Sequence, residues 1–339
     1  PAALGPLPRG GGGGTVAAAR GRRRGSSARP ASVRPMSLRP FNAWLGLPLL
    51  LLSGSLWGIT FPLSKMGIEG GIPPFAYGVW VSGLSATLLL CLLAARGERL
   101  PLGRAYLRLY LLIGVLGMAL PNIAYYFYIP HMPAGLAAVI ITTSPLITFV
   151  IALALAIEKF NPLRACGVAL GFGGALMLVL PGSALPAPDA LPWVLLAFAT
   201  PFFYASSNIV MSQLRPRDLG APAMAAGMFL ASFLSQLPLV AISGQWYALL
   251  PPSQAHGWAL VAQVVCSASA HVISLSMMPR LGPVFMSQGG FIVSLAGILW
   301  GLVFFDETLS PWAYGAAAVI IAGVALVNLG GYLRRRQAA

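Results

Sequence analysis

The chain has 339 residues, of which 58% are hydrophobic and 8% are charged. A water-soluble domain carries about 25% charged residues, so this composition excludes a surface that faces water throughout and predicts an integral membrane protein. The net charge of +14 would suit a nucleic-acid-binding protein, but the 21 Lys and Arg residues sit in a terminal tail and in short gaps between apolar runs, which membrane orientation explains without a nucleic-acid partner.

Residues 1–40 form a basic tail that contains Gly10–Gly14 and Arg20–Arg24 and almost no large apolar side chain. Such a composition cannot bury a core, so we expect disorder. No apolar run precedes residue 43, which argues against a cleavable signal peptide. Because Met36 lies just before the first apolar run, we hypothesise that the native protein begins there and that residues 1–35 are upstream translation.

The rest of the chain consists of apolar runs long enough to span a membrane, because a helix needs about 20 apolar residues to cross ~30 Å of hydrocarbon. The ten predicted transmembrane helices lie near residues 43–64, 74–95, 107–128, 134–156, 163–181, 191–213, 222–243, 257–278, 283–305 and 312–332. The gaps between them, such as Arg280–Gly282 before the ninth span, are too short for a soluble domain. The runs are too long for barrel strands, so the expected fold class is an all-α membrane protein.

The basic residues predict how the spans are oriented. With the N-terminus in the cytoplasm, only Lys65 of the 21 Lys and Arg residues falls on the outer side. An odd number of spans would place Arg334–Arg336 outside. We therefore expect both termini in the cytoplasm and a multi-pass protein of the bacterial cytoplasmic, or inner, membrane.

The sequence contains a weak internal repeat. Three residues recur 149 positions later: Glu158, Pro162 and Gly174 as Glu307, Pro311 and Gly323. Trp57 in the first span corresponds loosely to Tyr204 in the sixth. Residues 41–182 and 190–333 then form two halves of five spans each, and an odd number of spans makes tandem halves insert in opposite orientations. Inverted repeats are a recurrent transporter plan, with the substrate site near the middle of the membrane.

Several stretches carry a family resemblance: Trp57-Gly58-Ile59-Thr60-Phe61-Pro62-Leu63-Ser64-Lys65, Ala134-Gly135-Leu136-Ala137-Ala138, Ser144-Pro145-Leu146, and the Glu158 and Glu307 turns. In order and spacing, the chain over about 43–332 resembles EamA-type members of the drug/metabolite transporter superfamily. The resemblance implies two inverted five-helix repeats around a central cavity, and export or exchange of amino acids, other metabolites or drugs. The chain departs from the pattern at Val293-Ser294, where a second proline would make the kink symmetric.

Polar and aromatic side chains within the spans are the candidate residues of that cavity. His271 lies inside the eighth span, and titratable groups inside a membrane are expensive and often functional. A histidine also suits proton exchange, and the 149-residue offset places His271 opposite Asn122. The candidate substrate-binding set is Trp57, Lys65, Asn122, Tyr126, Ser144, Tyr204, Asn208, His271 and Gln288. Ordinary hydrogen bonding between helices is the alternative role for each of them.

The few charged residues near span ends have two interpretations. Lys65 could attract an anionic substrate group, or it could extend to the membrane interface with Glu69 as its partner. Glu158 and Glu307 are expected to be structural, capping the following turn and pairing with Lys159, Arg164 or lipid headgroups. His131 and His256 are expected to be solvated in outer loops.

Prolines and glycines predict bends and close contacts. Prolines lie within five spans, at Pro62, Pro121, Pro145, Pro201 and Pro238, and each frees a backbone carbonyl. Gly167 and Gly171 form a GxxxG spacing, which predicts a close helix contact within the chain or in a homodimer.

These observations favour a secondary transporter that exports or exchanges small organic solutes by alternating access. Its expected partners are a small-molecule substrate and the lipid bilayer, with no cofactor and no metal site, since the three cysteines lie far apart. The sequence contains no GxxxxGK[ST] motif, so we do not expect ATP hydrolysis. A carrier of nucleotide sugars or phosphorylated metabolites remains an alternative, although it would need several intramembrane cations. A membrane-embedded enzyme is another, although neither HExxH nor GxSxG occurs.

Overall fold

The computed structural model describes residues 46–179, 190–216, 218–249, 254–287, 289–307 and 309–338. The chain divides into two compact units, Pro1–Leu38 and Arg39–Ala339, and the following description concerns the second. The predicted disordered tail, the start at Met36 and the candidate residue Gln288 lie outside the described residues.

All regular structure in the described residues is helical, which confirms the predicted all-α class. The elements are α1 (Gly46–Glu69), α2 (Pro74–Ala95), α3 (Arg104–Gly114), the π-helical turn η2 (Val115–Ala119), α4 (Leu120–Tyr128), the 3-10 turn η3 (Ile129–His131), α5 (Ala134–Ile141), α6 (Ser144–Ala154), α7 (Pro162–Val179), α8 (Leu191–Ala197), α9 (Ala199–Leu214), α10 (Ala221–Ser243), α11 (Ala255–Ser287), α12 (Gly289–Phe305) and α13 (Pro311–Ala338).

The described part of the chain holds eight helices that are long and apolar enough to cross a membrane. Two further apolar helices, Pro162–Met177 and Ile292–Phe305, are shorter. They coincide with the fifth and ninth predicted spans, so each predicted span overlaps an apolar helix.

Proline marks where three helices begin. Pro74, Pro162 and Pro311 are the first residues of α2, α7 and α13. At this position the missing N–H would have no helical partner, and the fixed φ angle of proline suits the first turn. The starts predicted at 74, 163 and 312 therefore agree with the structure to within one residue.

Three predicted spans are interrupted rather than continuous. α5 ends at Ile141 and α8 ends at Ala197, each four residues before a proline, Pro145 and Pro201. A proline cannot donate a hydrogen bond to the carbonyl four residues earlier, and its ring clashes with that carbonyl, which places the two breaks. In the third span the π-helical turn η2 ends at Ala119, and Pro121 is the second residue of the helix α4 that follows it. Pro62 and Pro238, by contrast, lie within the unbroken helices α1 and α10.

The break predicted at Arg280–Gly282 is wrong. α11 runs through these residues to Ser287, and α12 begins at Gly289 rather than at residue 283. A continuous helix bonds more backbone groups than a loop would in hydrocarbon, and single prolines are tolerated there. The first span is also longer than predicted, since α1 extends to Glu69.

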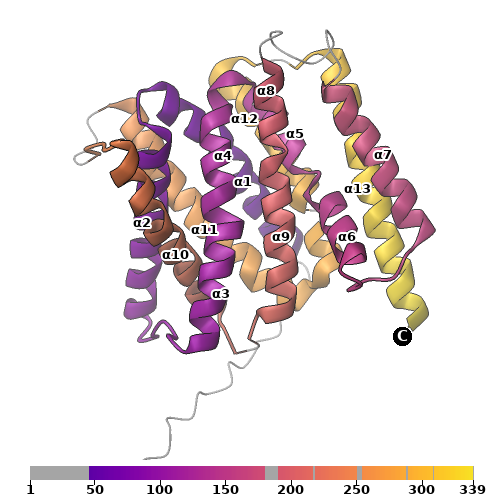
Figure 1. The fold of residues 1–339 in the computed structure, drawn as a ribbon, viewed down its shortest axis with the longest axis horizontal. Helices are drawn as coiled ribbons and strands as arrows, with labels where there is room; N and C mark the ends of the chain where they lie inside the picture. Colours follow the sequence, from indigo (N-terminus) through magenta and orange to yellow (C-terminus); the bar gives the residue numbers. More distant parts are fainter. Residues whose placement is uncertain are drawn as a thin grey trace, which may run out of the picture. The chain divides into compact units, whose positions relative to one another are not determined.

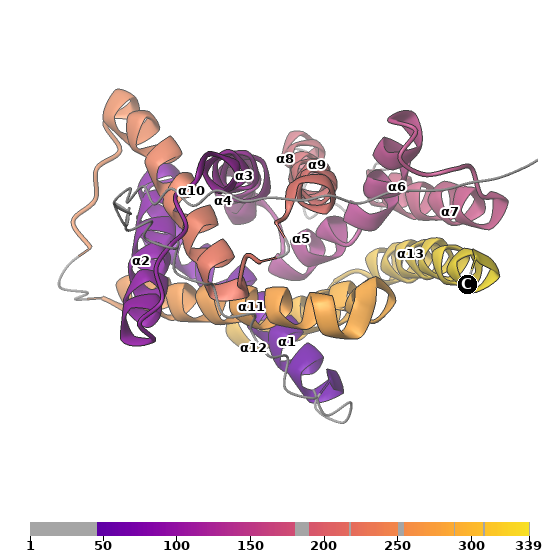
Figure 2. The same ribbon diagram turned by 90° about the horizontal axis from the view of Figure 1, so that it is seen from below.

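Within this unit, helices distant in sequence pack side by side. α7 lies along α13 at one edge, and α2 lies along α10 at the other (Figures 1 and 2). Between the two edges, α1 packs against α11 and α12, while α9 packs against α4 and α6. The helices α1 and α9 therefore occupy the middle of the unit, each with two helical neighbours.

The contact between α7 and α13 is reciprocal and depends on glycine. A β-carbon on Gly323 would lie 2.6 Å from the carbonyl oxygen of Gly167, and one on Gly174 would lie 3.0 Å from that of Ala316. Gly323 and Ala316 are the residues 149 positions after Gly174 and Gly167, so each helix offers the other the same contact. The predicted close contact of the GxxxG segment is thus confirmed within the chain.

Replacing Gly323 by Ala should destabilise the protein by about 1–3 kcal/mol, because the added methyl group has no space against the α7 backbone. Gly315→Ala in the same helix is the matched control, since no atom lies within 4 Å of its β-carbon position. Denaturant unfolding of the purified protein in detergent measures both variants. Equal stability of the two variants would contradict the close contact.

Candidate functional site

A cavity of about 340 Å³ lies in the middle of the unit, where α1, α4, α9 and α11 meet the break between α5 and α6. Its volume is that of a pocket for a small organic molecule. Aromatic side chains, hydroxyls and amides line it. Among the described lining residues there is no Lys, Arg, Asp or Glu, so the cavity is polar without carrying a fixed charge.

The structure brings together most of the predicted site residues. Seven of them line the cavity: Trp57, Asn122, Tyr126, Ser144, Tyr204, Asn208 and His271. Lys65 is not among the lining residues, and Gln288 lies outside the described part of the chain. Contact of these side chains with a substrate remains a prediction.

One wall of the cavity is a polar seam between the antiparallel helices α1 and α11. Three pairs meet along it: Ser53 and Ser274 with 2.6 Å between hydroxyl oxygens, Trp57 and His271 with 4.5 Å between ring centroids, and Ser64 and Gln263 with 2.7 Å between oxygens. The α11 members recur every three or four residues together with Ser267, which places them on one helix face. Gln263, Ser267 and Ser274 were not predicted as site residues, although this spacing was visible in the sequence.

His271 has one nitrogen available to a solute in the cavity. Its Nδ1 donates to the carbonyl oxygen of Ser267 at 2.9 Å, and a carbonyl can only accept. In the neutral ring Nε2 is therefore an acceptor. The imidazole lies between the rings of Trp57 and Phe229, at 4.5 and 4.8 Å between centroids. Its bond stays within α11, so the alternative of a histidine hydrogen-bonded between helices is not what the structure shows.

A related pair forms the opposite wall. The hydroxyl of Tyr204 on α9 donates to Oδ1 of Asn122 on α4 at 3.4 Å. In the weak internal repeat Asn122 corresponds to His271 at the offset of 149, and Tyr204 corresponds loosely to Trp57, two positions away from that offset. An aromatic side chain from the first helix of each half therefore meets a polar side chain from the third.

The break between α5 and α6 contributes a free hydroxyl. Thr142 and Thr143 bond back to the carbonyl oxygens of Val139 and Ile140, at 2.6 and 2.7 Å. Ser144 follows them, is buried, and lines the cavity. Its Oγ has no hydrogen-bond partner within the described residues. Buried hydroxyls normally have partners, so Ser144 can bond a solute without losing an existing bond.

A buried network closes the cavity toward the C-terminal end of α1. Oε1 of Gln263 accepts from the hydroxyls of Ser64 and Tyr77, at 2.7 and 2.6 Å. The amide of Gln263 donates to the hydroxyl of Tyr126 at 3.5 Å. Beside them, Tyr125 donates to the carbonyl oxygen of Phe61 at 3.0 Å. Tyr77 was not predicted, because its position in a second span gives no sign of this partner.

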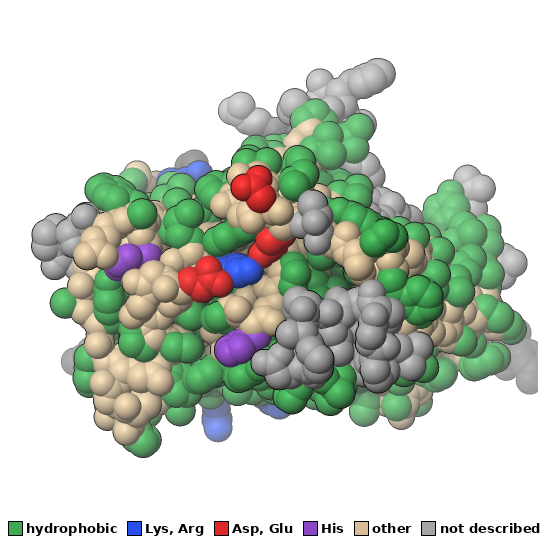
Figure 3. All heavy atoms as spheres, turned by 90° about the horizontal axis from the view of Figure 1, so that it is seen from above, with side chains coloured by type: hydrophobic (Ala, Val, Ile, Leu, Met, Phe, Trp, Pro, Cys, Tyr) green, Lys and Arg blue, Asp and Glu red, His purple; other side chains and the backbone are tan. Residues whose placement is uncertain are grey.

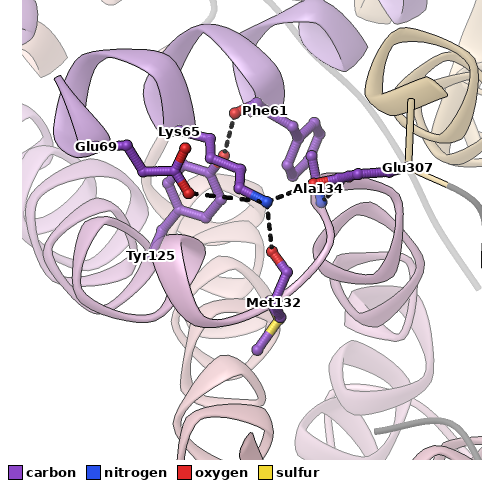
Figure 4. Close-up of polar contacts among 7 residues, drawn as sticks. All are labelled: Phe61, Lys65, Glu69, Tyr125, Met132, Ala134 and Glu307. Atoms are coloured by element: carbon purple, nitrogen blue, oxygen red, sulfur yellow. Dashed lines mark hydrogen bonds and ion pairs between the residues drawn. The ribbon is translucent and has the colours of Figure 1, made fainter. Parts of the chain in front are cut away.

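Lys65 lies beyond this network, in the charge cluster drawn in Figure 4. Its ammonium group forms an ion pair with Glu307, lies 3.4 Å from the carbonyl oxygen of Met132, and lies 3.9 Å from the carboxylate of Glu69. The expected Glu69 partner is confirmed. The expectation that Glu307 pairs with Lys159 or Arg164 is wrong, since α1 brings Lys65 to it instead. Glu307 caps α5 by accepting from the N–H of Ala134 at 2.7 Å.

The face around this cluster is otherwise poor in charge. Figure 3 shows a basic side chain flanked by acidic ones in the middle of the face that carries the end of α1. The two histidines expected to be solvated have partners. His131 stacks on Trp193 at 3.7 Å between centroids, and Nε2 of His256 lies 2.7 Å from the hydroxyl of Tyr247.

The glutamate of the first half behaves as predicted. Glu158 forms an ion pair with Arg164. The guanidinium group also lies over the ring of Phe149, at 3.9 Å from its centroid. This pair joins residues on either side of the turn between α6 and α7, so it stays within one half of the chain.

Comparison with known proteins shows that the chain is similar to membrane transporters. Residues 44–180 match the EamA-like transporter family. The chain is 28% identical over 285 residues to the uncharacterized inner membrane transporter YedA of Escherichia coli K12, covering 82% of this chain and 89% of YedA. It is 25% identical over 310 residues to a probable terminal-alkyne amino-acid exporter of Streptantibioticus cattleyicolor, covering 86% and 95% of the two chains.

A solved crystal structure shares the fold. It superposes with a TM-score of 0.56 at 18% sequence identity, covering 88% of this chain and 100% of the other.

The closing network should contribute to stability, whereas the free hydroxyl should not. Gln263→Leu removes the acceptor of Ser64 and Tyr77 and should destabilise the protein by about 1 kcal/mol. Ser144→Ala removes a hydroxyl without a described partner and should leave the free energy of unfolding unchanged or slightly raised. Denaturant unfolding in detergent compares them, and a larger loss for Ser144→Ala would contradict the assignment.

Proposed function

Since the chain carries an EamA-like transporter domain over residues 44–180, we propose that it is a secondary transporter of the cytoplasmic membrane that exports or exchanges small organic metabolites such as amino acids. The central cavity is the substrate site, and it alternates its access between the two sides of the membrane. The observation that carries the proposal is a cavity of about 340 Å³ at the meeting of both halves, with unused hydrogen-bonding groups on its walls.

The charge of the cavity favours a substrate without net charge. The available groups are the hydroxyl of Ser144, Nε2 of His271 and the amide of Asn122, beside aromatic walls. A zwitterion or a neutral polar molecule suits these groups. The relative from Streptantibioticus cattleyicolor, named as an amino-acid exporter, points the same way.

The alternative functions fit less well. A nucleotide sugar would bring phosphate charges into a cavity that has no Lys or Arg among its described lining residues, and burying unpaired charge is unfavourable. An embedded enzyme would need a nucleophile activated by a base. Within the described residues the Ser144 hydroxyl has no hydrogen-bond partner, so it is not held against His271 as an activated nucleophile would be.

Two observations support ten spans arranged as inverted halves, 41–182 and 190–333. Gly174 and Gly323 make the same contact in opposite directions between the antiparallel helices α7 and α13. The pair of Trp57 and His271 recurs as Tyr204 and Asn122. Inverted halves provide two equivalent arrangements around one site, which is the basis of alternating access.

The position of the cavity supports an inward-facing state. On α1 its lining begins at Leu50, near the first residue Gly46, and ends at Phe61, two turns before Glu69. The lining on α12 likewise includes Gly289, the first residue of that helix. With both termini in the cytoplasm, the cavity is displaced toward the inner side, while the network of Gln263 closes the outer side.

A ligand screen tests the substrate class. Amino acids and other uncharged or zwitterionic metabolites should include a compound that stabilises the purified protein, by about 2.7 kcal/mol at a concentration of one hundred times Kd. Trp57→Ala should remove this stabilisation. Trp258→Ala, on the exposed side of α11, is the matched control and should retain it. Stabilisation by nucleotide sugars alone would support the alternative carrier instead.

A second experiment tests coupling through His271. In proteoliposomes, His271→Gln should abolish uptake driven by a pH gradient, because Gln cannot take up a proton, and should leave exchange at equal pH in place. His256→Gln is the control, since His256 bonds Tyr247 away from the cavity. Undiminished pH-driven uptake by His271→Gln would remove this residue from coupling.

A further inference from the structure

The charge cluster at the outer end of α1 lies outside the cavity, and the proposed substrate binding assigns it no role. We infer that the ion pair between Lys65 and Glu307 is the latch of an outer gate. When the pair is formed, it holds the two halves together above the cavity. It must separate before the cavity can open to the outside. This inference rests on the proposed function only in taking the cavity as the transport path.

The latch joins parts of the chain that belong to different halves. Lys65 lies on α1, and Glu307 lies between α12 and α13. One carboxylate oxygen of Glu307 bonds Lys65, and the other accepts from the N–H of Ala134 at the start of α5, at 2.7 Å. A single side chain of the second half is therefore tied to two helices of the first (Figure 4).

The surroundings make this pair stronger than an ordinary surface ion pair. Both side chains are 13% exposed, so salt and water screen them little. The ammonium group also lies 5.0 Å from the ring centroid of Phe305, a favourable cation–π position. Removing one member leaves the other charge poorly solvated, which is strongly unfavourable.

The second carboxylate near Lys65 provides a natural comparison. Glu69 lies one turn further along the same helix, at 3.9 Å, and is 41% exposed. A pair of this kind adds little, and it cannot hold two halves together because both members are on α1. The Lys65–Glu69 pair therefore cannot act as the latch, whereas the Lys65–Glu307 pair can.

The latch lies directly above the cavity. Phe61 is the last cavity-lining residue on α1, and Lys65 follows it by four residues, or about 6 Å along the helix. Tyr125 fixes this turn by donating to the carbonyl oxygen of Phe61 at 3.0 Å. Moving α1 away from the turn that carries Glu307 would thus open a path from the outer surface toward Phe61.

The two sides of the membrane differ in how they are held. Glu158, the counterpart of Glu307 in the first half, pairs with Arg164 across the turn between α6 and α7. That pair stays within one half and can persist whichever way the halves lean. Among the described residues, the buried ion pair that joins the halves lies on the outer side, whereas the inner-side link from the hydroxyl of Tyr106 to the carboxylate of Asp218 is exposed. The buried pair therefore favours the inward-facing arrangement.

Cysteine labelling tests the latch without relying on transport. Ser144→Cys serves as a reporter in the cavity, in a background in which Cys91, Cys166 and Cys266 are replaced by Ser. Intact cells are treated with a membrane-impermeant thiol reagent from the outside. Adding Glu307→Gln should raise the labelling rate about tenfold. Gln can still accept from the N–H of Ala134, so this change removes the ion pair and keeps the cap.

Matched variants separate the latch from general loosening. Glu69→Gln and Glu158→Gln should change outside labelling by less than about twofold. Lys65→Gln should resemble Glu307→Gln, and the double variant should add nothing further, because both act on one interaction. Lys65→Arg should retain slow labelling. If Glu307→Gln does not fold, Lys65→Gln and Lys65→Arg carry the same comparison.

Several outcomes would overturn the inference. They are equal labelling of the Glu307→Gln and Glu69→Gln proteins, no increase for Lys65→Gln, or an additive double variant. Uptake measured in parallel distinguishes this failure from that of the proposed function. If labelling responds to the variants and no solute is carried, the latch stands and the transport proposal fails. If the unmodified protein carries solute and labelling does not respond, the latch fails alone.

Discussion

In hydrocarbon, a hydroxyl, amide or imidazole finds hydrogen-bond partners only within the protein. The packing of α1 on α11 follows from this constraint. Their polar side chains recur on one face of each helix and meet in register, as Ser53 with Ser274 and Ser64 with Gln263. At the cavity the pairing is incomplete. Within the described residues Ser144 has no hydrogen-bond partner and His271 bonds through Nδ1 only, so a solute can bond at these positions.

Helices pack more closely at the edge of the unit than in its middle. At one edge, α7 and α13 approach so closely that glycine is required on both, through Gly174 and Gly323. In the middle, α1 and α9 meet partners through larger side chains around a cavity of about 340 Å³. Backbone contact of this kind resists sliding, whereas side-chain contacts around a void can be exchanged. The edge is therefore the tighter contact, and the middle holds the cavity.

Charge is scarce in this chain, and its placement is correspondingly informative. Lys65 and Glu307 satisfy each other at the closed end of the cavity, with Phe305 beside them. Glu158 and Arg164 satisfy each other within one turn. The two glutamates occupy equivalent positions in the repeat, yet one links the halves and the other does not. Glu307 therefore joins segments that are distant in sequence, whereas Glu158 joins neighbours in the chain.

The sequence by itself determined that the protein lies in lipid, that it is helical, and most of the candidate cavity residues. Long apolar runs have one stable solution in lipid, and Pro74, Pro162 and Pro311 start helices through local chemistry. Pro145 and Pro201 predicted bends in their spans, and the helices break four residues before them, at Ile141 and Ala197. The sequence did not reveal that α11 continues past Arg280, because hydropathy averaged over a span is insensitive to single hydrogen bonds. Only the tertiary structure paired Lys65 with Glu307 and gathered Tyr77 around Gln263, because these partners come from helices that are distant in sequence and meet only when the unit is packed.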